Sequence, residues 1–183
     1  MKEREHDPRR LDVERFASDA QRLEGNWPLS GMHRLVEACH AEDRPAATER
    51  VHWQASAERR RVGAGESHAW LKLAIDAQPK LTCQRCLGPV DTPLRFERWF
   101  HFVAGEEQAA ALDADAEEDV LASTRALDLH QLAEDELLLA LPLVPRHEAC
   151  PDPLPAIRVD PSFDEAAEAN PFAVLAGLGR RAH

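Results

Sequence analysis

The sequence has no long apolar run. Nothing in its 183 residues approaches the roughly 18 consecutive apolar residues of a membrane-spanning helix. The start, MKEREHDPRRLDVERF, is charged throughout and has no apolar stretch of the kind a secretory signal needs. We therefore expect a cytoplasmic protein that contacts no membrane.

An excess of basic residues is also absent. Residues 1–61 carry 12 Lys and Arg against 12 Asp and Glu, and residues 62–183 carry 10 against 21, so the second stretch holds the whole net charge of -11. A protein that binds nucleic acid mainly through phosphates normally has a basic field. We expect any contact with nucleic acid to be indirect or weak, and a basic protein partner, such as a ribosomal protein, to suit this surface better.

Catalytic motifs are missing too. The chain contains no H-E-x-x-H, no Gly-rich phosphate loop and no G-x-S-x-G. Glu134 and Asp135 are adjacent carboxylates, but their place in an amphipathic helical pattern predicts a solvated face. Tyrosine is absent, and the four tryptophans are expected to pack in the core and on the sheet. We predict that the protein is not an enzyme.

Cysteine is scarce, with four residues in the whole chain. In a cytosolic protein of this size, such a set favours thiol or metal chemistry over a disulfide framework. Cys39, in MHRLVEACH, is expected to be a small apolar residue on a helix face.

The other three cysteines suggest a metal site. Cys83 and Cys86 form a C-x-x-C pair, whose spacing lets both thiolates point to one centre, and RHEACP supplies His147 and Cys150. We predict a structural zinc site formed by Cys83, Cys86, His147 and Cys150. Two alternatives stay open: two ordinary reduced thiols in a turn, and a redox pair. A redox pair favours the start of a helix, whereas the Gly-Pro that follows here predicts a turn between strands.

The hydrophobic pattern predicts an α+β protein. Helical spacing indicates helices over 9–24 and 30–41, with GNWP as a break between them and Ser30 as the N-cap of the second. Alternation predicts strands over 50–59, 68–83 and 91–103, and a short fourth strand over 120–123. Because turns rather than helices join them, we expect an antiparallel sheet, either open or barrel-like.

The second half of the chain predicts one strong helix. In ALDLHQLAEDELLLALPLVP, Asp128 is the expected N-cap, Pro142 the end, and LLLALPLV a deeply packed run. The acidic segment 105–119 is expected to be an exposed loop with at most a turn of helix. We divide the single domain into N-terminal helices (1–48), a core of sheet and helix (49–150) and a proline-rich extension (151–183). The extension ends in a short helix within NPFAVLAGLGRR.

Three stretches resemble the YceD family of bacterial and plant organellar proteins. LTCQRCLGPV is similar to the family's strand and C-x-R-C. DLHQLAEDELLLALPLVPRHEAC resembles its helix, its L-x-L-P segment and its cysteine-containing stretch, and NPFAVLAGLGRR resembles the C-terminal ending of proteobacterial members. The resemblance implies a non-enzymatic role in the synthesis, processing or stability of 23S ribosomal RNA. In the family, the neighbouring genes usually encode a large-subunit ribosomal protein and a phospholipid-synthesis enzyme. The resemblance therefore implies these two proteins as candidate partners.

We accordingly expect a ribosome-biogenesis factor that contacts a large-subunit ribosomal protein or a pre-ribosomal particle. Two other functions stay open. One is an adaptor that regulates a phospholipid-synthesis enzyme, and the other is a metal-dependent hydrolase that trims precursor RNA. The hydrolase would need an open metal position, which three sulfur ligands make less suitable.

Overall fold

The computed structural model describes residues 6–62 and 65–151. The predicted C-terminal helix within 170–181 lies outside these residues. Where the structure is described, the elements in chain order are α1 (Val13–Ser18), β1 (Arg22–Pro28), the 3-10 helix η1 (Leu29–Gly31), α2 (His33–Ala38), β2 (Arg50–Val62), β3 (Glu66–Ala77), β4 (Lys80–Thr82), β5 (Pro89–Asp91), β6 (Leu94–Val103), α3 (Glu106–Asp113), β7 (Asp119–Ala122) and α4 (Leu129–Leu139).

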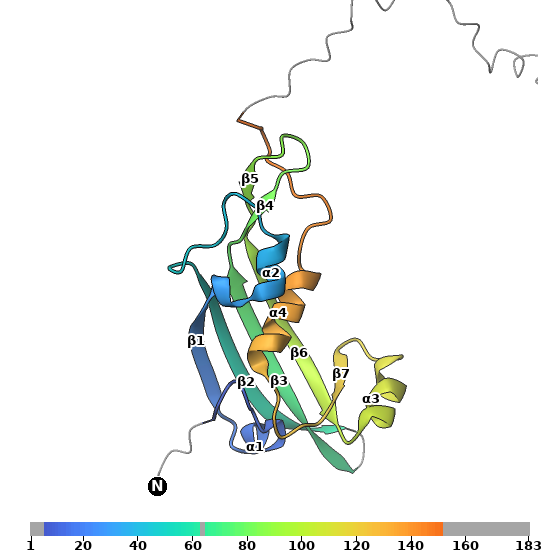
Figure 1. Ribbon diagram of the computed structural model, residues 1–183. Coiled ribbons are helices and arrows are strands. Elements are labelled where there is room, and N and C mark those ends of the chain that lie inside the picture. The colour runs from blue at the N-terminus through green and yellow to red at the C-terminus, as the bar shows by residue number, and fades with distance from the viewer. Residues whose placement is uncertain (1–5, 63–64, 152–183) are drawn as a thin grey trace, which may run out of the picture. The chain divides into compact units, whose positions relative to one another are not determined.

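Five strands form one sheet in the order β1-β2-β3-β6-β7, and β4 and β5 form a separate two-stranded hairpin. The α+β class and a mostly antiparallel sheet are therefore confirmed. The sheet is open, with β1 and β7 at its edges (Figure 1). Antiparallel pairing was the wrong prediction for the last strand, because β7 pairs parallel to β6. The link between them contains α3, which returns the chain to the same end of the sheet as parallel pairing requires.

The predicted helix over 9–24 is the largest error in the fold. The chain forms only the six-residue α1, and Ala20 at φ 48 stops the helical path before β1 begins. In β1 the half-buried residues alternate with exposed ones, so the segment has a period of two. Gly25 lies opposite Trp53, and a Cβ on it would be 3.0 Å from the indole Cζ2. GNWP is therefore part of a strand that makes room for a tryptophan ring.

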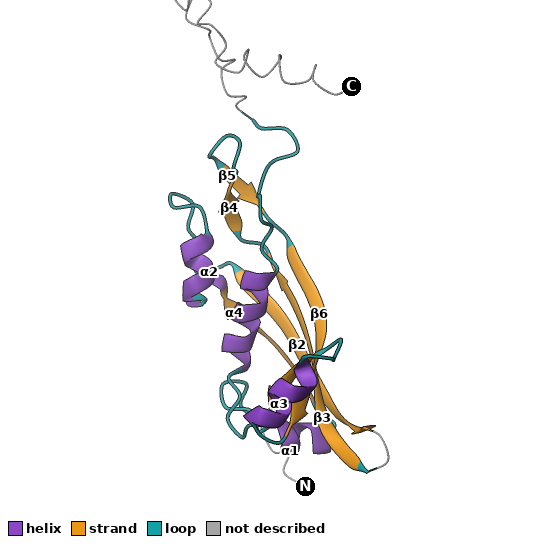
Figure 2. Ribbon diagram, turned by 90° about the vertical axis from the view of Figure 1, so that its right-hand side faces the viewer, coloured by secondary structure: helices purple, strands orange, loops and turns teal. Residues whose placement is uncertain are grey.

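The core lies between the sheet and its helices. α2 and α4 lie against one face of the sheet (Figure 2). Alternate residues of β2 and β3 point to this face, as the sequence pattern predicted, and the buried side chains of α4 complete the cluster. The fully buried core side chains include Phe16, Leu71, Leu73, Phe100 and Leu137. Burial of this apolar area is the main term that stabilises the sheet.

The tryptophans pack as expected. Trp53 is buried and stacks on Trp27, with ring centroids 4.5 Å apart. Trp70 stacks on His101 at 4.5 Å, and the guanidinium of Arg60 lies 3.8 Å from the centre of the Trp99 ring. The side chains in the last two contacts alternate along the strands with the buried residues of β2 and β3. They therefore lie on the other face of the sheet and stabilise it there.

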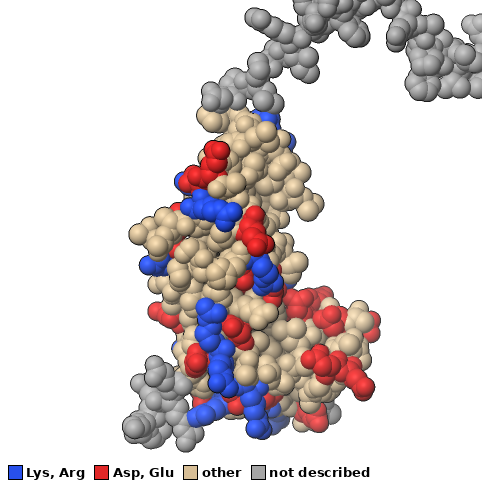
Figure 3. Space-filling model, viewed as in Figure 1, with Lys and Arg blue, Asp and Glu red and all other residues tan. Residues whose placement is uncertain are grey.

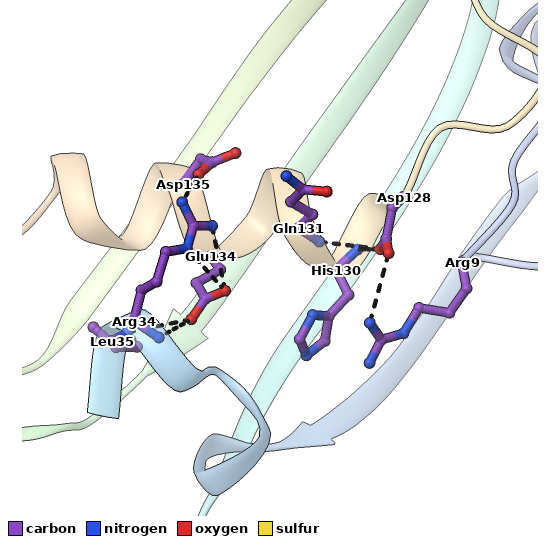
Figure 4. A network of polar contacts seen from close by, with 8 residues as sticks. All are labelled: Arg9, Arg34, Leu35, Asp128, His130, Gln131, Glu134 and Asp135. Carbon is purple, nitrogen blue, oxygen red and sulfur yellow. Dashed lines mark hydrogen bonds and ion pairs between the residues drawn. The ribbon is translucent and has the colours of Figure 1, made fainter. Parts of the chain in front are cut away.

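The N-cap of α4 is confirmed. The carboxylate of Asp128 accepts hydrogen bonds from the backbone N–H groups of His130 (3.0 Å) and Gln131 (3.1 Å), as Figure 4 shows. The expectation that LLLALPLV is deeply packed is wrong beyond its first residues. Leu139 is 74% exposed and Leu143 is fully exposed. A single helix face touches the sheet, and the chain leaves the helix at Leu139.

Glu134 is not on a solvated face, contrary to the sequence prediction. Its side chain is buried, and its carboxylate accepts hydrogen bonds from the backbone N–H groups of Arg34 (2.7 Å) and Leu35 (3.2 Å) (Figure 4). These groups lie in the first turn of α2, which no side chain of its own caps. Ser30, the expected cap, lies in η1 instead. Asp135 is half-exposed and pairs with Arg34.

The acidic segment 105–119 contains more structure than expected. α3 spans eight residues, and Ala109 packs on Val103 and Val120. The acidic side chains stay exposed or partly exposed, and in Figure 3 Asp and Glu gather on the α3 side while Lys and Arg gather near α1. The prediction of an exposed acidic segment holds, but an eight-residue helix replaces most of the loop.

Candidate metal centre

The first half of the centre is the turn that joins β4 to β5. Cys83 donates its backbone N–H to the carbonyl of Gly88 (2.9 Å), and its own carbonyl accepts from the N–H of Leu87 (2.9 Å). Leu87 has a φ of 62, the left-handed conformation that such a tight loop needs. The turn therefore brings the side chains of Cys83 and Cys86 to one side, as the C-x-x-C spacing predicted.

The second half is the segment that follows α4. The backbone N–H of Gln84 donates to the carbonyl of Pro145 (2.8 Å), which joins this segment to the turn. His147 and Cys150 follow directly, and the ligand atoms of the four predicted residues all lie within 4.8 Å of one another. Sequence periodicity could not show that the strand turn and the helix exit meet. The structure brings all four residues together.

The distances match a tetrahedral metal site. A zinc ion with Zn–S bonds of about 2.3 Å and Zn–N bonds of about 2.0–2.1 Å sets its ligands about 3.8 Å apart for two sulfurs and about 3.6 Å for sulfur and nitrogen. The sulfurs of Cys83 and Cys150 are 3.9 Å apart, and Cys86 Sγ is 3.4 Å from His147 Nδ1. The four residues thus fit a zinc ion in both donor type and spacing.

The imidazole of His147 is oriented for this role. Its Nε2 lies 2.9 Å from the carbonyl oxygen of Pro89, which can only accept a hydrogen bond. A proton on Nε2 leaves Nδ1, the atom that faces Cys86, free to bind a metal. Such a bond from the far nitrogen to a carbonyl is the usual second contact of a metal-binding histidine.

The thiols of the turn differ in acidity. Burial raises the pKa of Cys83, but the backbone N–H groups of Cys86, Arg85 and His147 outweigh it and lower the pKa to about 5. For Cys86 the backbone N–H of Gly88 lowers the pKa, whereas burial and the neighbouring sulfurs raise it, and the net direction is upward. One thiolate therefore forms readily, and the neighbouring sulfurs disfavour a second negative charge beside it.

Arg85 is a residue of the centre that sequence reasoning gave no role. Its Nε donates to the sulfur of Cys150 (3.0 Å), and its Nη2 donates to the backbone carbonyls of His147 (3.1 Å) and Glu148 (3.2 Å). The hydrogen bond to Cys150 also raises the pKa of Arg85. A cationic side chain between the two cysteines of C-x-x-C was the available signal, but the sequence alone could not show where it points.

Cys39 lies outside the group, as predicted. It is buried and its thiol donates to the carbonyl of Leu35 (3.3 Å), and burial raises its pKa. The redox alternative finds no support in the local geometry, because β5 rather than a helix follows the turn.

Several large apolar side chains are exposed on the segments that form or lead into the centre. Leu87 at the tip of the turn is 67% exposed, and Leu143 and Val144 precede the histidine ligand with 100% and 59% exposure. Together with Leu139, we call these side chains the apolar ridge. Large exposed apolar side chains of this kind are candidates for contact with another protein.

Comparisons with known proteins place the centre within a family match. The model of a family described as "Large ribosomal RNA subunit accumulation protein YceD" matches residues 71–179, which include all four candidate ligands. The chain is 38% identical over 114 residues to the Large ribosomal RNA subunit accumulation protein YceD of Haemophilus influenzae. That alignment covers 60% of this chain and 64% of the relative. No solved structure matches. Among the residues that the structure describes, no helix is long and apolar enough to cross a membrane.

Proposed function

The chain belongs to the YceD family, and from this premise we propose that it supports the accumulation of large-subunit ribosomal RNA in the cytoplasm without being an enzyme. The observation that carries the proposal is the family match over residues 71–179. The relative from Haemophilus influenzae has the same printed role. A finer role in the synthesis, processing or stability of 23S RNA is part of the proposal.

The centre is proposed to hold one structural zinc ion through Cys83, Cys86, His147 and Cys150. Three thiolates and one imidazole fill a tetrahedral zinc ion, so no position is left for water or substrate. This closed donor set supports a structural role over the metal-dependent hydrolase. The ion, when bound, cross-links the β4–β5 turn to the segment after α4.

A large-subunit ribosomal protein, or the pre-ribosomal particle that contains it, is the proposed partner. Such proteins are basic, and the segment 105–119 of this chain carries seven Asp and Glu and no Lys or Arg. The apolar ridge adds a surface of the kind that protein partners bury. Contact with the RNA itself is proposed to be indirect or weak.

The test is the ratio of mature large- to small-subunit ribosomal RNA in a strain that lacks the gene. Reintroduced wild type is expected to restore the ratio. The double variant Cys83→Ser, Cys86→Ser is expected to fail, whereas Cys39→Ala, which removes a thiol outside the group, is expected to succeed. An unchanged ratio on deletion would contradict the proposed function.

The partner is tested by co-sedimentation. The double variant Leu143→Ser, Val144→Ser is expected to lose its association with pre-large-subunit particles at low salt. Val62→Ser removes an exposed apolar side chain on β2, outside both the ridge and segment 105–119, and serves as the control. Absence of the wild type from every ribosomal fraction would overturn the partner. Recovery of a phospholipid-synthesis enzyme instead would favour the adaptor.

A further inference from the structure

Arg85 joins the two halves of the metal centre. It lies in the turn between two of the ligands, yet its guanidinium makes all three of its hydrogen bonds to the other half, at the sulfur of Cys150 and the carbonyls of His147 and Glu148. A guanidinium has five N–H donors in a fixed plane and can serve these acceptors together. A lysine ammonium lacks that geometry.

The bond to sulfur has an electrostatic consequence. Three thiolates and a neutral imidazole give a zinc ion a net charge of -1, and the Arg85 guanidinium brings one compensating positive charge to the Cys150 sulfur at 3.0 Å. Hydrogen bonds to charged acceptors are stronger than those between neutral groups. This bond therefore offsets part of the negative charge that the Cys150 sulfur would carry when it binds the metal.

The bonds to the carbonyls have a geometric consequence. The segment that holds His147 and Cys150 belongs to no helix or strand, so few backbone hydrogen bonds fix its path. Gln84 fixes its start through Pro145, and Arg85 fixes the stretch between the two ligands. Two ligands on an irregular segment need such support if they are to face the other two ligands, Cys83 and Cys86.

We propose that Arg85 is a positioning residue that retains the metal, because it holds the His147–Cys150 segment against the turn and compensates the charge on the Cys150 sulfur. The inference rests on the proposed zinc site, which it deepens. Mutation of a residue that hydrogen-bonds to the ligands of a metal site, without binding the metal itself, typically costs about 10- to 100-fold in metal affinity. We expect a loss at the lower end of that range, because Arg85 is exposed to solvent.

The experiment compares the purified full chain with Arg85→Met, Arg85→Lys and, as the matched control, Arg146→Met. Arg146 is exposed in the same segment and makes no side-chain hydrogen bond or ion pair to the residues that the structure describes. Zinc content is measured first, and the rate of zinc transfer to a chromogenic chelator second. Arg85→Met should release zinc about tenfold faster than wild type, Arg85→Lys should lie between them, and Arg146→Met should match wild type.

A spectroscopic measurement separates the bond to sulfur from a general effect on folding. With Co²⁺ in place of zinc, the sulfur-to-cobalt absorption bands should shift in Arg85→Met and stay in place in Arg146→Met. Equal release rates and identical bands in wild type and both Arg85 variants would overturn the role of Arg85 while the zinc site stands. If Arg85→Met does not fold, Arg85→Lys decides by the same criteria. A wild type without zinc would overturn both the site and this inference.

Discussion

The sheet and the metal centre are held together by different forces. In the sheet, long strands and helices bury side chains such as Leu71, Leu73 and Phe100 almost completely. The β4–β5 hairpin at the candidate metal centre has two strands of three residues each. Its buried apolar contacts are limited to a small cluster around Leu81, Cys83 and Val90. A region that small does not bury enough apolar surface to fix its own shape and depends on cross-links. The comparison teaches that apolar burial can fix the sheet and its helices while the hairpin region has few such contacts, which is where the proposed zinc ion would add a cross-link.

The largest effect is expected from damage to the sheet core. Phe100→Ala removes a ring that is 1% exposed, and the cavity it leaves should lower the free energy of unfolding by about 3–5 kcal/mol. Urea unfolding monitored by circular dichroism measures it. Leu112→Ala, at a 41% exposed side chain, should change stability by less than about 0.5 kcal/mol. Equal losses in the two variants would contradict a core held by burial.

An intermediate effect is expected at the buried carboxylate of α4. Glu134→Ala leaves the backbone N–H groups of Arg34 and Leu35 without an acceptor, which should lower the free energy of unfolding by about 1–3 kcal/mol. The zinc content should not change, because this contact belongs to the sheet and its helices. Loss of zinc in this variant would show that the two regions are coupled. Asp135→Ala, at the half-exposed neighbour, is the control.

A smaller effect is expected from pH. Burial lowers the pKa of His130, helped by Arg9, and burial also lowers the pKa of His101, helped by His68. An unfolded histidine has a pKa of about 6.5. The unfolded chain therefore binds more protons than the folded one below that value, so stability should be full above pH 6.5 and fall as the pH decreases through it. Thermal melts from pH 8 to pH 5 measure the slope, which His130→Gln should reduce.

The smallest effect on the sheet is expected from removal of the metal. After treatment with a chelator, amides of the turn and of the segment after α4, such as those of Cys83 and Gln84, should exchange with solvent much faster. Amides of β2 and β3 should keep their protection. Hydrogen exchange read by mass spectrometry separates the regions. Equal loss of protection in both would mean that the sheet also depends on the metal.

Much of this fold could be predicted from local patterns in the sequence. Alternation in β2 and β3 and the cap at Asp128 follow from contacts within a few residues and are confirmed. The single strand expected over 68–83 is wrong beyond Ala77, because residues 80–82 form β4 in the separate hairpin. The family resemblance is confirmed as well. The four candidate ligands were named from spacing alone, and the structure places them together.

The errors arise where distant contacts decide. Residues 22–24 fall within a helical pattern in the sequence, and pairing with β2 makes them part of strand β1. The sequence pattern places Glu134 on the surface of α4. In the structure it is covered by α2, which lies a hundred positions earlier in the chain. The role of Arg85 depends on the meeting of its turn with residues 147–150, more than 60 positions later. Sequence periodicity has no information on such encounters.

The most direct test of the account is the number of zinc ions bound per chain, measured by elemental analysis and native mass spectrometry on protein purified under reducing conditions. The account predicts one zinc ion in wild type and in Cys39→Ala, and none in Cys150→Ser or in the Cys83→Ser, Cys86→Ser double variant. Wild-type protein without metal, folded and with four free thiols, would contradict it.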